Sequence, residues 1–280
     1  MPHQKLDCLP AELRARLNDM DDPDRFVVWS DDLYGDVDGD GLPELPVSRI
    51  PDGKSAALIR AALEAPTPTY RERAGIRNIA RPFADGVFSV IRGTSPLLIL
   101  QPTVFDQRPP ISLAAEQLYF MLHGDYVDGS RFWGEDTPAN QEAINIGNLP
   151  ETLCGVVFTG CCWGALTTET PAGLVEAGRP FGQKTPEASM ALSMLARGVT
   201  AFVGCTGAHY SPDQAPYGYY GDPMHTAFWK HFTRGKSPAE ALFNAKIDYL
   251  AAMPHGRQGR THLAIEFKIL REYTCLGLGW

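Results

Sequence analysis

The feature that most constrains the fold of this chain is a series of short, almost continuously apolar runs separated by helical patterns. The predicted strands cover residues 26–30, 45–49, 87–91, 97–100, 117–122, 156–159 and 199–203. Their apolar residues do not alternate with polar ones, which is typical of strands buried on both faces. We therefore expect an α/β fold, with a mostly parallel central sheet flanked by helices.

Four helical patterns lie between these runs. We predict helices over 54–64, 112–116, 186–197 and 238–252, and surface loops over 66–82, 102–111, 128–150 and 208–223. The pattern at 238–252 starts with Ser237 as N-cap, Pro238 at the first helical position and Glu240 in the first turn. No repeat or linker divides the chain, so we expect a single domain over 1–280, with 1–25 as an N-terminal extension.

Charge and hydropathy exclude several function classes. The formal net charge is −8, so binding to nucleic acid through phosphate neutralisation is not expected. No apolar run is long enough for a membrane-spanning helix or a signal-peptide core. We therefore expect a cytoplasmic protein, or a secreted one if the chain is a segment of a longer precursor. The six cysteines are expected to be free thiols.

Chemistry-bearing residues follow two of the predicted strands. His123 and Gly124 come directly after the run that ends at 122, and Cys161 and Cys162 follow Gly160 at the end of the run 156–159. The carboxyl ends of neighbouring parallel strands meet at one edge of a sheet, where ligands bind. A histidine and a thiol at that edge could act as general base and nucleophile.

These two elements resemble the His-Gly and small-residue-Cys elements of the caspase-like (clan CD) cysteine peptidases. The chain is most similar to the gingipain-like family, with CHAT-domain proteases second. The segment DDLYGDVDGDGLPELPVSRIP at 31–51 is similar to a segment near the start of gingipain-like catalytic domains, although Ser48 replaces their usual glycine. The segments 196–207 and 232–249 resemble the strand after the catalytic cysteine and the helix that closes the domain.

The resemblance implies a caspase–hemoglobinase-like fold and a cysteine endopeptidase acting on a protein or peptide substrate. His123 would be the general acid/base, and the backbone N–H groups of Gly124 and Cys161 would bind the oxyanion. Cys161 is the preferred nucleophile because a glycine, Gly164, follows three positions later. Cys162 is the alternative, because it follows a small residue, Cys161, and Gly164 stands two positions after it. No third catalytic residue is assigned, and a regulatory partner protein is expected from the CHAT likeness.

Two other activities remain open: a catalytically silent scaffold or binding module, and a thiol acyltransferase. No cofactor is required by any of them. Asp36, Asp38 and Asp40 begin like a calcium loop, but Val47 stands where an EF-hand has glutamate, so structural calcium and a plain acidic turn are both open. A further set of residues is expected to line the substrate pocket: Thr206, His209 and Tyr210.

Overall fold

A six-stranded sheet with the order β10-β9-β8-β5-β3-β4 forms the centre of the computed structural model. The model describes residues 4–18, 21–100, 112–137, 139–176, 181–253 and 259–279. The strands are β3 (Arg73–Asn78), β4 (Leu98–Leu100), β5 (Gln117–Met121), β8 (Val156–Thr159), β9 (Ala201–Cys205) and β10 (Tyr273–Gly277). All neighbours are parallel except β10, which pairs with β9 in antiparallel fashion. The prediction of a mostly parallel central sheet is confirmed.

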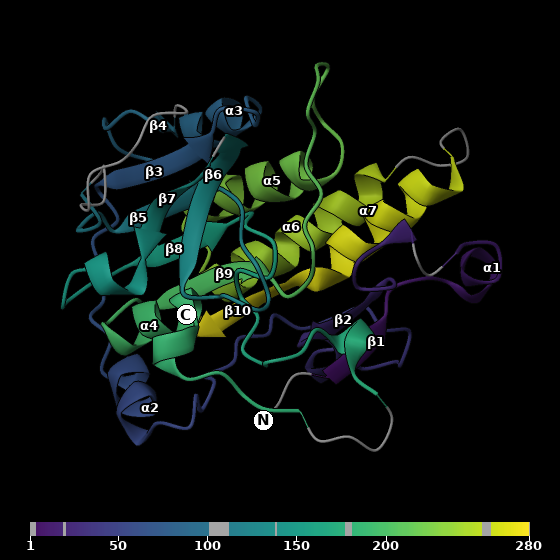
Figure 1. Ribbon diagram of the computed structural model, residues 1–280, viewed down its shortest axis with the longest axis horizontal. Helices are drawn as coiled ribbons and strands as arrows, with labels where there is room; N and C mark the ends of the chain where they lie inside the picture. The colour runs from purple at the N-terminus through teal and green to yellow at the C-terminus, as the bar shows by residue number, and fades with distance from the viewer. Residues whose placement is uncertain are drawn as a thin grey trace.

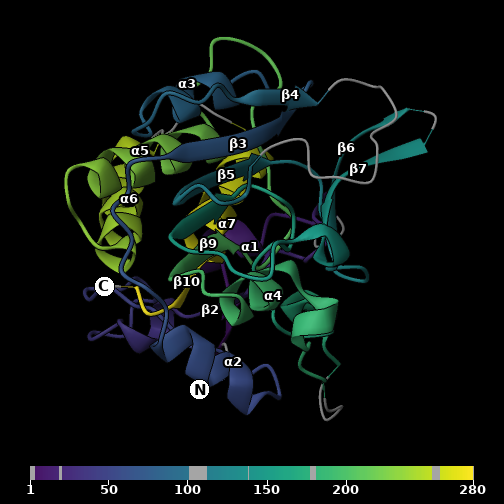
Figure 2. The same ribbon diagram turned by 90° about the vertical axis from the view of Figure 1, so that its left-hand side faces the viewer.

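Helices cover both faces of this sheet (Figures 1 and 2). One core cluster contains residues of α3 (Ala84–Ser89), α5 (Gly221–Thr233), α6 (Pro238–Ala252) and α7 (Arg260–Glu272). The cluster on the other face contains residues of α2 (Ala56–Leu63), α4 (Met190–Ala196) and the strands β6 (Arg131–Thr137) and β7 (Ala139–Asn145). In Figure 2, α5 and α6 lie on one side of the sheet, and α4, β6 and β7 lie on the other.

Two antiparallel pairs stand outside the central sheet. One is β6 with β7, and the other is β1 (Gln4–Asp7) with β2 (Val27–Ser30). The short helical turns are α1 (Ala11–Arg14), η2 (Asp32–Tyr34), η3 (Ile146–Asn148), η4 (Ala172–Leu174) and η5 (Pro186–Ala188). The expected N-terminal extension is packed against the rest of the chain, because β1 pairs with β2 and both Cys8 and Leu9 are buried.

The predicted helix over 238–252 is confirmed as α6, and its start follows from local chemistry. The side chain of Ser237 accepts a hydrogen bond from the backbone N–H of Glu240, whose carboxylate accepts one from the N–H of Ser237. This capping box satisfies two donors at the helix end. Within the predicted helix 186–197, α4 begins only at Met190, after Ser189 as its N-cap.

Several predicted elements are wrong. The apolar run 87–91 belongs to α3 and the turn after it, because Ala84, Val87 and Phe88 are buried at helical spacing. The run 45–49 contains only one bridge residue, Arg49, opposite Leu276, and 112–116 is not helical. The predicted loops 66–82 and 128–150 contain β3, β6 and β7. The predicted loop 102–111 lies outside the described residues. No helix in the described part of the chain is long and apolar enough to cross a membrane.

Candidate active site

The ends of β5 and β8 bring the histidine and the two cysteines together. These strands are adjacent and parallel, with Phe120 opposite Thr159. His123 and Cys162 each lie three residues beyond that pair, at the carboxyl edge of the sheet. Gly124 shows how close the two segments approach, because a Cβ placed on it would lie 2.4 Å from the carbonyl oxygen of Cys162. The residue after His123 therefore touches the backbone of the cysteine turn.

The two cysteines lie in different environments. Cys161 is fully buried in the core cluster that contains Phe120 and Leu122, and burial raises the pKa of its thiol to about 12. Cys162 is partly exposed, and its sulfur lies 3.4 Å from the backbone nitrogen of His209. Burial raises the pKa of the Cys162 thiol to about 11, although the hydrogen bond from His209 lowers it. Accessibility therefore favours Cys162 over Cys161, the residue preferred from the sequence.

His123 is held by β6 and a carboxylate. Its backbone forms a bridge with Trp133, whose carbonyl oxygen accepts a hydrogen bond of 2.8 Å from the His123 N–H. The Nε2 atom of His123 lies 3.4 Å from a carboxylate oxygen of Glu135, which also accepts a bond of 2.8 Å from the side-chain amide of Asn78. About a third of the His123 side chain is exposed, at 31%. Glu135 was not among the predicted site residues because it lies in a segment expected to be a loop.

Two backbone N–H groups at this edge are available to a ligand. Among the residues that the structure describes, no acceptor receives a hydrogen bond from the N–H of Gly124 or of Cys162. The N–H of Cys161, by contrast, donates to the hydroxyl oxygen of Thr159 at 3.0 Å. An oxyanion could therefore be bound by Gly124 and Cys162, whereas the expected donor Cys161 already has an acceptor.

Trp163, the residue after Cys162, adopts a left-handed backbone conformation with φ of +53°. Its N–H donates to the carbonyl oxygen of Gly207 at 2.8 Å, and the N–H of Gly164 donates to the carbonyl oxygen of Cys161 at 3.0 Å. The indole of Trp163 packs edge-on against the ring of Tyr126, with 5.3 Å between ring centroids. Such a backbone conformation is unfavourable for a bulky residue and persists only where surrounding contacts hold it.

The three residues expected to line the substrate pocket, Thr206, His209 and Tyr210, have side chains that bond to other residues of the protein. Thr206 is 1% exposed, and its hydroxyl donates to the carbonyl oxygens of Trp29 and Glu272. The side chain of His209 is fully buried, 3.1 Å from a carboxylate oxygen of Glu272, and burial lowers its pKa to about 3. The hydroxyl of Tyr210 donates to Asp22 at 2.8 Å. The burial of Thr206 and His209 argues against contact of either side chain with a substrate.

In the part of the chain that the structure describes, two groups of side chains have the spacing of metal ligands. The predicted calcium ligands Asp36, Asp38 and Asp40 gather with Glu44, with one ligand atom of each within 4.8 Å of the others. A second group, Cys205, His209 and Glu272, is enclosed in the core, and its members come from β9, the loop after it and α7. Because Glu272 already pairs with His209, we interpret the second group as part of a buried polar network.

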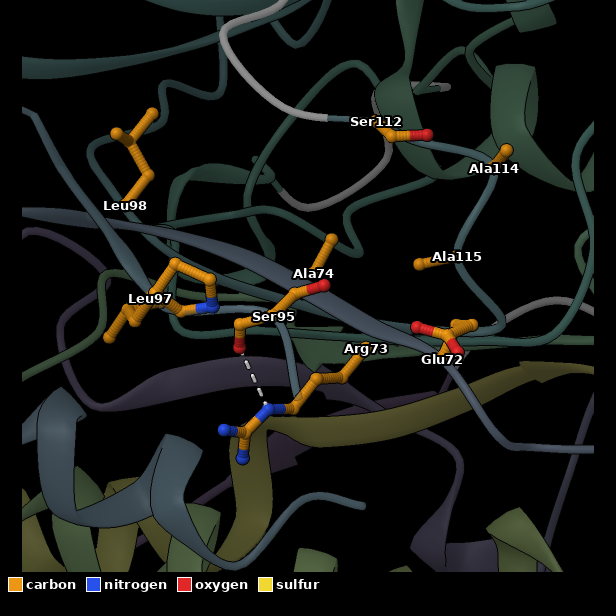
Figure 3. A pocket seen from close by; sticks show the side chains of 10 residues that line it. Glu72, Arg73, Ala74, Ser95, Leu97, Leu98, Ser112, Ala114 and Ala115 are labelled. Atoms are coloured by element: carbon orange, nitrogen blue, oxygen red, sulfur yellow. Dashed lines mark hydrogen bonds between the residues drawn. The ribbon is translucent and has the colours of Figure 1, made fainter. Parts of the chain in front are cut away.

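A cavity of about 460 Å³ lies away from this site (Figure 3). It is lined by residues at the starts of β3 and β4, including Arg73 and Leu98, and by residues before β5, including Ala115. The guanidinium of Arg73 donates to the carbonyl oxygen of Ser95 at 3.0 Å. Since β3, β4 and β5 are parallel, their starts lie at the edge of the sheet opposite His123. The cavity is therefore not part of the candidate active site.

Comparison with known proteins gives matches at the level of structure. No protein-family model matches the chain, and neither does any curated protein. A solved structure titled "Structure of Protease" matches with a TM-score of 0.51 and 13% sequence identity, covering 90% of this chain and 59% of that one. At this identity the likeness shows that the two chains share a fold, and nothing about activity.

Two crystal structures of the Saccharomyces cerevisiae separase–securin complex also match. They were determined at 3.0 and 2.6 Å, and they give TM-scores of 0.45 and 0.48 with 12% identity. These matches cover 84% and 85% of this chain but 14% of the other chain in each case. With TM-scores below 0.5, they support no conclusion by themselves. The chain thus spans only part of the length of all three matched proteins.

Proposed function

We propose that this chain is a caspase-like cysteine endopeptidase with Cys162 as the nucleophile and His123 as the general acid/base. The observation that carries the proposal is the direct contact between the His123–Gly124 segment and the backbone of Cys162 at adjacent strand ends. A thiol on a partly exposed residue, an imidazole and two N–H groups without an acceptor at one sheet edge are the groups that acyl transfer to a thiol requires.

The first step would be attack on a peptide carbonyl. The Cys162 thiol has a raised pKa, so it is protonated at neutral pH, and His123 takes its proton as the sulfur attacks the carbonyl carbon. The resulting oxyanion accepts hydrogen bonds from the N–H groups of Gly124 and Cys162. His123 then gives its proton to the leaving amine, and a thioester to Cys162 remains.

The second step would release the acyl group. His123 removes a proton from water, the hydroxide oxygen attacks the thioester, and the thiol leaves with the proton returned by His123. Glu135 would orient the imidazole through the contact with Nε2, and the negative charge of its carboxylate would stabilise the imidazolium. This chemistry balances without a cofactor. The closer likeness to gingipain-like or CHAT-domain peptidases, and a regulatory partner protein, remain proposals based on the sequence.

Intact-mass labelling with a panel of peptidyl acyloxymethyl ketones tests the proposal. Wild type should take up one label, Cys162→Ala none, and His123→Ala should react more slowly. Cys161→Ala is the matched control: it removes the neighbouring buried thiol and should still be labelled. Label that disappears in Cys161→Ala and persists in Cys162→Ala would instead identify Cys161 as the nucleophile.

The same samples separate the two alternative functions. A catalytically silent scaffold would react with the panel no faster than an ordinary thiol does. An acyltransferase would be labelled, but in the presence of added amines it would form amide products from a peptide ester substrate in preference to hydrolysis. Release of free acid as the main product under those conditions supports the endopeptidase.

A further inference from the structure

We infer that Asp24, a buried residue from the N-terminal segment before β2, positions the Cys162 nucleophile through both segments that flank it. The inference rests on the proposed function of Cys162. No property of the sequence around Asp24 indicated this role. The residue does not touch the sulfur, so it is a positioning residue and not a catalytic one.

The Asp24 carboxylate accepts hydrogen bonds from the two segments that lie against the Cys162 thiol. Its Oδ1 accepts a hydrogen bond of 2.9 Å from the indole N–H of Trp163, the residue that follows Cys162. Its Oδ2 accepts one of 2.6 Å from the backbone N–H of Ala208. The next residue, His209, donates its own N–H toward the Cys162 sulfur at 3.4 Å. Asp24 therefore fixes the two segments between which the thiol lies.

The packing around this carboxylate leaves little freedom for the turn. A Cβ on Gly207 would lie 2.7 Å from Oδ2 of Asp24, so only glycine allows the backbone to approach this closely. The carbonyl oxygen of Gly207 accepts the hydrogen bond from the backbone N–H of Trp163. The left-handed conformation of Trp163 is thus held at its main chain by Gly207 and at its side chain by Asp24.

A buried lysine pairs with this carboxylate. The Nζ atom of Lys268, on α7, lies 2.6 Å from Oδ2 of Asp24 and 2.5 Å from Oδ1 of Asp22. Asp24 is 1% exposed and Lys268 is fully buried. Burial acts to lower the pKa of Lys268, but the two aspartates outweigh it and raise the pKa above its ordinary value. The lysine therefore stays protonated and holds Asp24 in place.

Asp24→Asn is the direct test, because an amide has only one oxygen acceptor for the three donors that Asp24 now satisfies. We expect the rate constant of Cys162 with a peptidyl acyloxymethyl ketone to fall about tenfold, and the pH profile of its alkylation by iodoacetamide to shift. Trp163→Phe removes a single donor and should cause a smaller loss. The double variant should be no slower than Asp24→Asn alone, since both changes break the same bond.

Asp32→Asn is the matched control. Asp32 is also buried, and both its oxygens accept hydrogen bonds from Nζ of Lys246, at 2.6 and 2.7 Å, far from the cysteine turn in sequence and with no bond to it among the described residues. The Asp32→Asn substitution should lower Tm. The rate constants of Cys162 with the peptidyl acyloxymethyl ketone and with iodoacetamide should stay within about twofold of wild type. All rates are measured well below the lowest Tm of the set.

Three outcomes would overturn the inference. The first is an Asp24→Asn variant whose labelling rates and pH profile match those of wild type. The second is a loss of rate in Asp32→Asn as large as that in Asp24→Asn. The third applies if Asp24→Asn does not fold, and is a Trp163→Phe variant that reacts at the wild-type rate. Failure of the proposed function gives a different result. If peptidyl reagents fail with wild type while Asp24→Asn still shifts the pH profile of Cys162 alkylation by iodoacetamide, the positioning role stands and the peptidase proposal does not.

Discussion

Replacing Gly124 by alanine tests the contact between the two segments of the candidate site. The added Cβ would lie 2.4 Å from the carbonyl oxygen of Cys162, whereas ordinary van der Waals contact begins near 3.4 Å. The segments must therefore separate by about 1 Å. A misplacement of this size costs about 100-fold in rate, equivalent to about 2.7 kcal/mol of transition-state stabilisation. The overpacking itself should destabilise the fold by about 1–3 kcal/mol.

The assay is the rate of labelling of Cys162 by a peptidyl electrophile, together with kcat on any peptide substrate found, at a temperature where Gly124→Ala is folded. Gly86→Ala is the matched control. An added Cβ there meets no atom within 4 Å, and Gly86 lies inside α3, so alanine should stabilise the protein by about 0.5–1 kcal/mol and leave the rate unchanged. A rate in Gly124→Ala within threefold of wild type would refute the idea that this contact sets the distance between base and nucleophile.

Three further predictions concern stability. Burial lowers the pKa of Lys184 to about 8, so between about pH 8 and 10.5 the unfolded chain binds a proton at this lysine that the folded protein does not, and the free energy of unfolding of wild type should rise with pH relative to that of Lys184→Met. Urea denaturation should show that Ser237→Ala, which removes the α6 cap, costs about 1 kcal/mol, and an unchanged midpoint would contradict the role of the cap. If calcium binds the group formed by Asp36, Asp38, Asp40 and Glu44, excess calcium should raise the Tm of wild type, and EGTA should reverse the rise. The rise should be much smaller in Asp38→Asn. An unchanged Tm in wild type would show that the segment is a plain acidic turn.

Strand β3 shows why part of the sheet could not be predicted. Three of its six residues, Arg73, Arg77 and Asn78, are polar, so the segment has no apolar run. In the structure the Arg77 guanidinium pairs with Asp85 at 2.7 Å, and that of Arg73 donates to backbone carbonyl oxygens in α3 and in the segment after it. These partners allow charged side chains within a central strand, but they lie outside it and leave no periodic pattern.

The candidate site could be predicted to a different extent for each residue. His123 and the cysteine pair were found because apolar strands end directly before them, and parallel strands place such ends at one edge. The choice between Cys161 and Cys162 depends on which side chain is accessible, which sequence spacing does not reveal. Glu135 could not be found because it lies in β6, a segment expected to be a loop. Asp24 could not be found because it is distant in sequence from the cysteine turn and meets it only through tertiary packing.

The ion pair between Asp24 and Lys268 also bears on the order of events during synthesis. These residues are 244 positions apart, so a ribosome adding about 5–20 residues per second needs about 10–50 s to make the lysine after the aspartate. Until α7 has emerged, Asp24 has no lysine to hold it, and the indole of Trp163 lacks a fixed acceptor. A nascent chain would therefore carry the Cys162 thiol in an unassembled turn, and the proposed peptidase activity would have to await the emergence of α7.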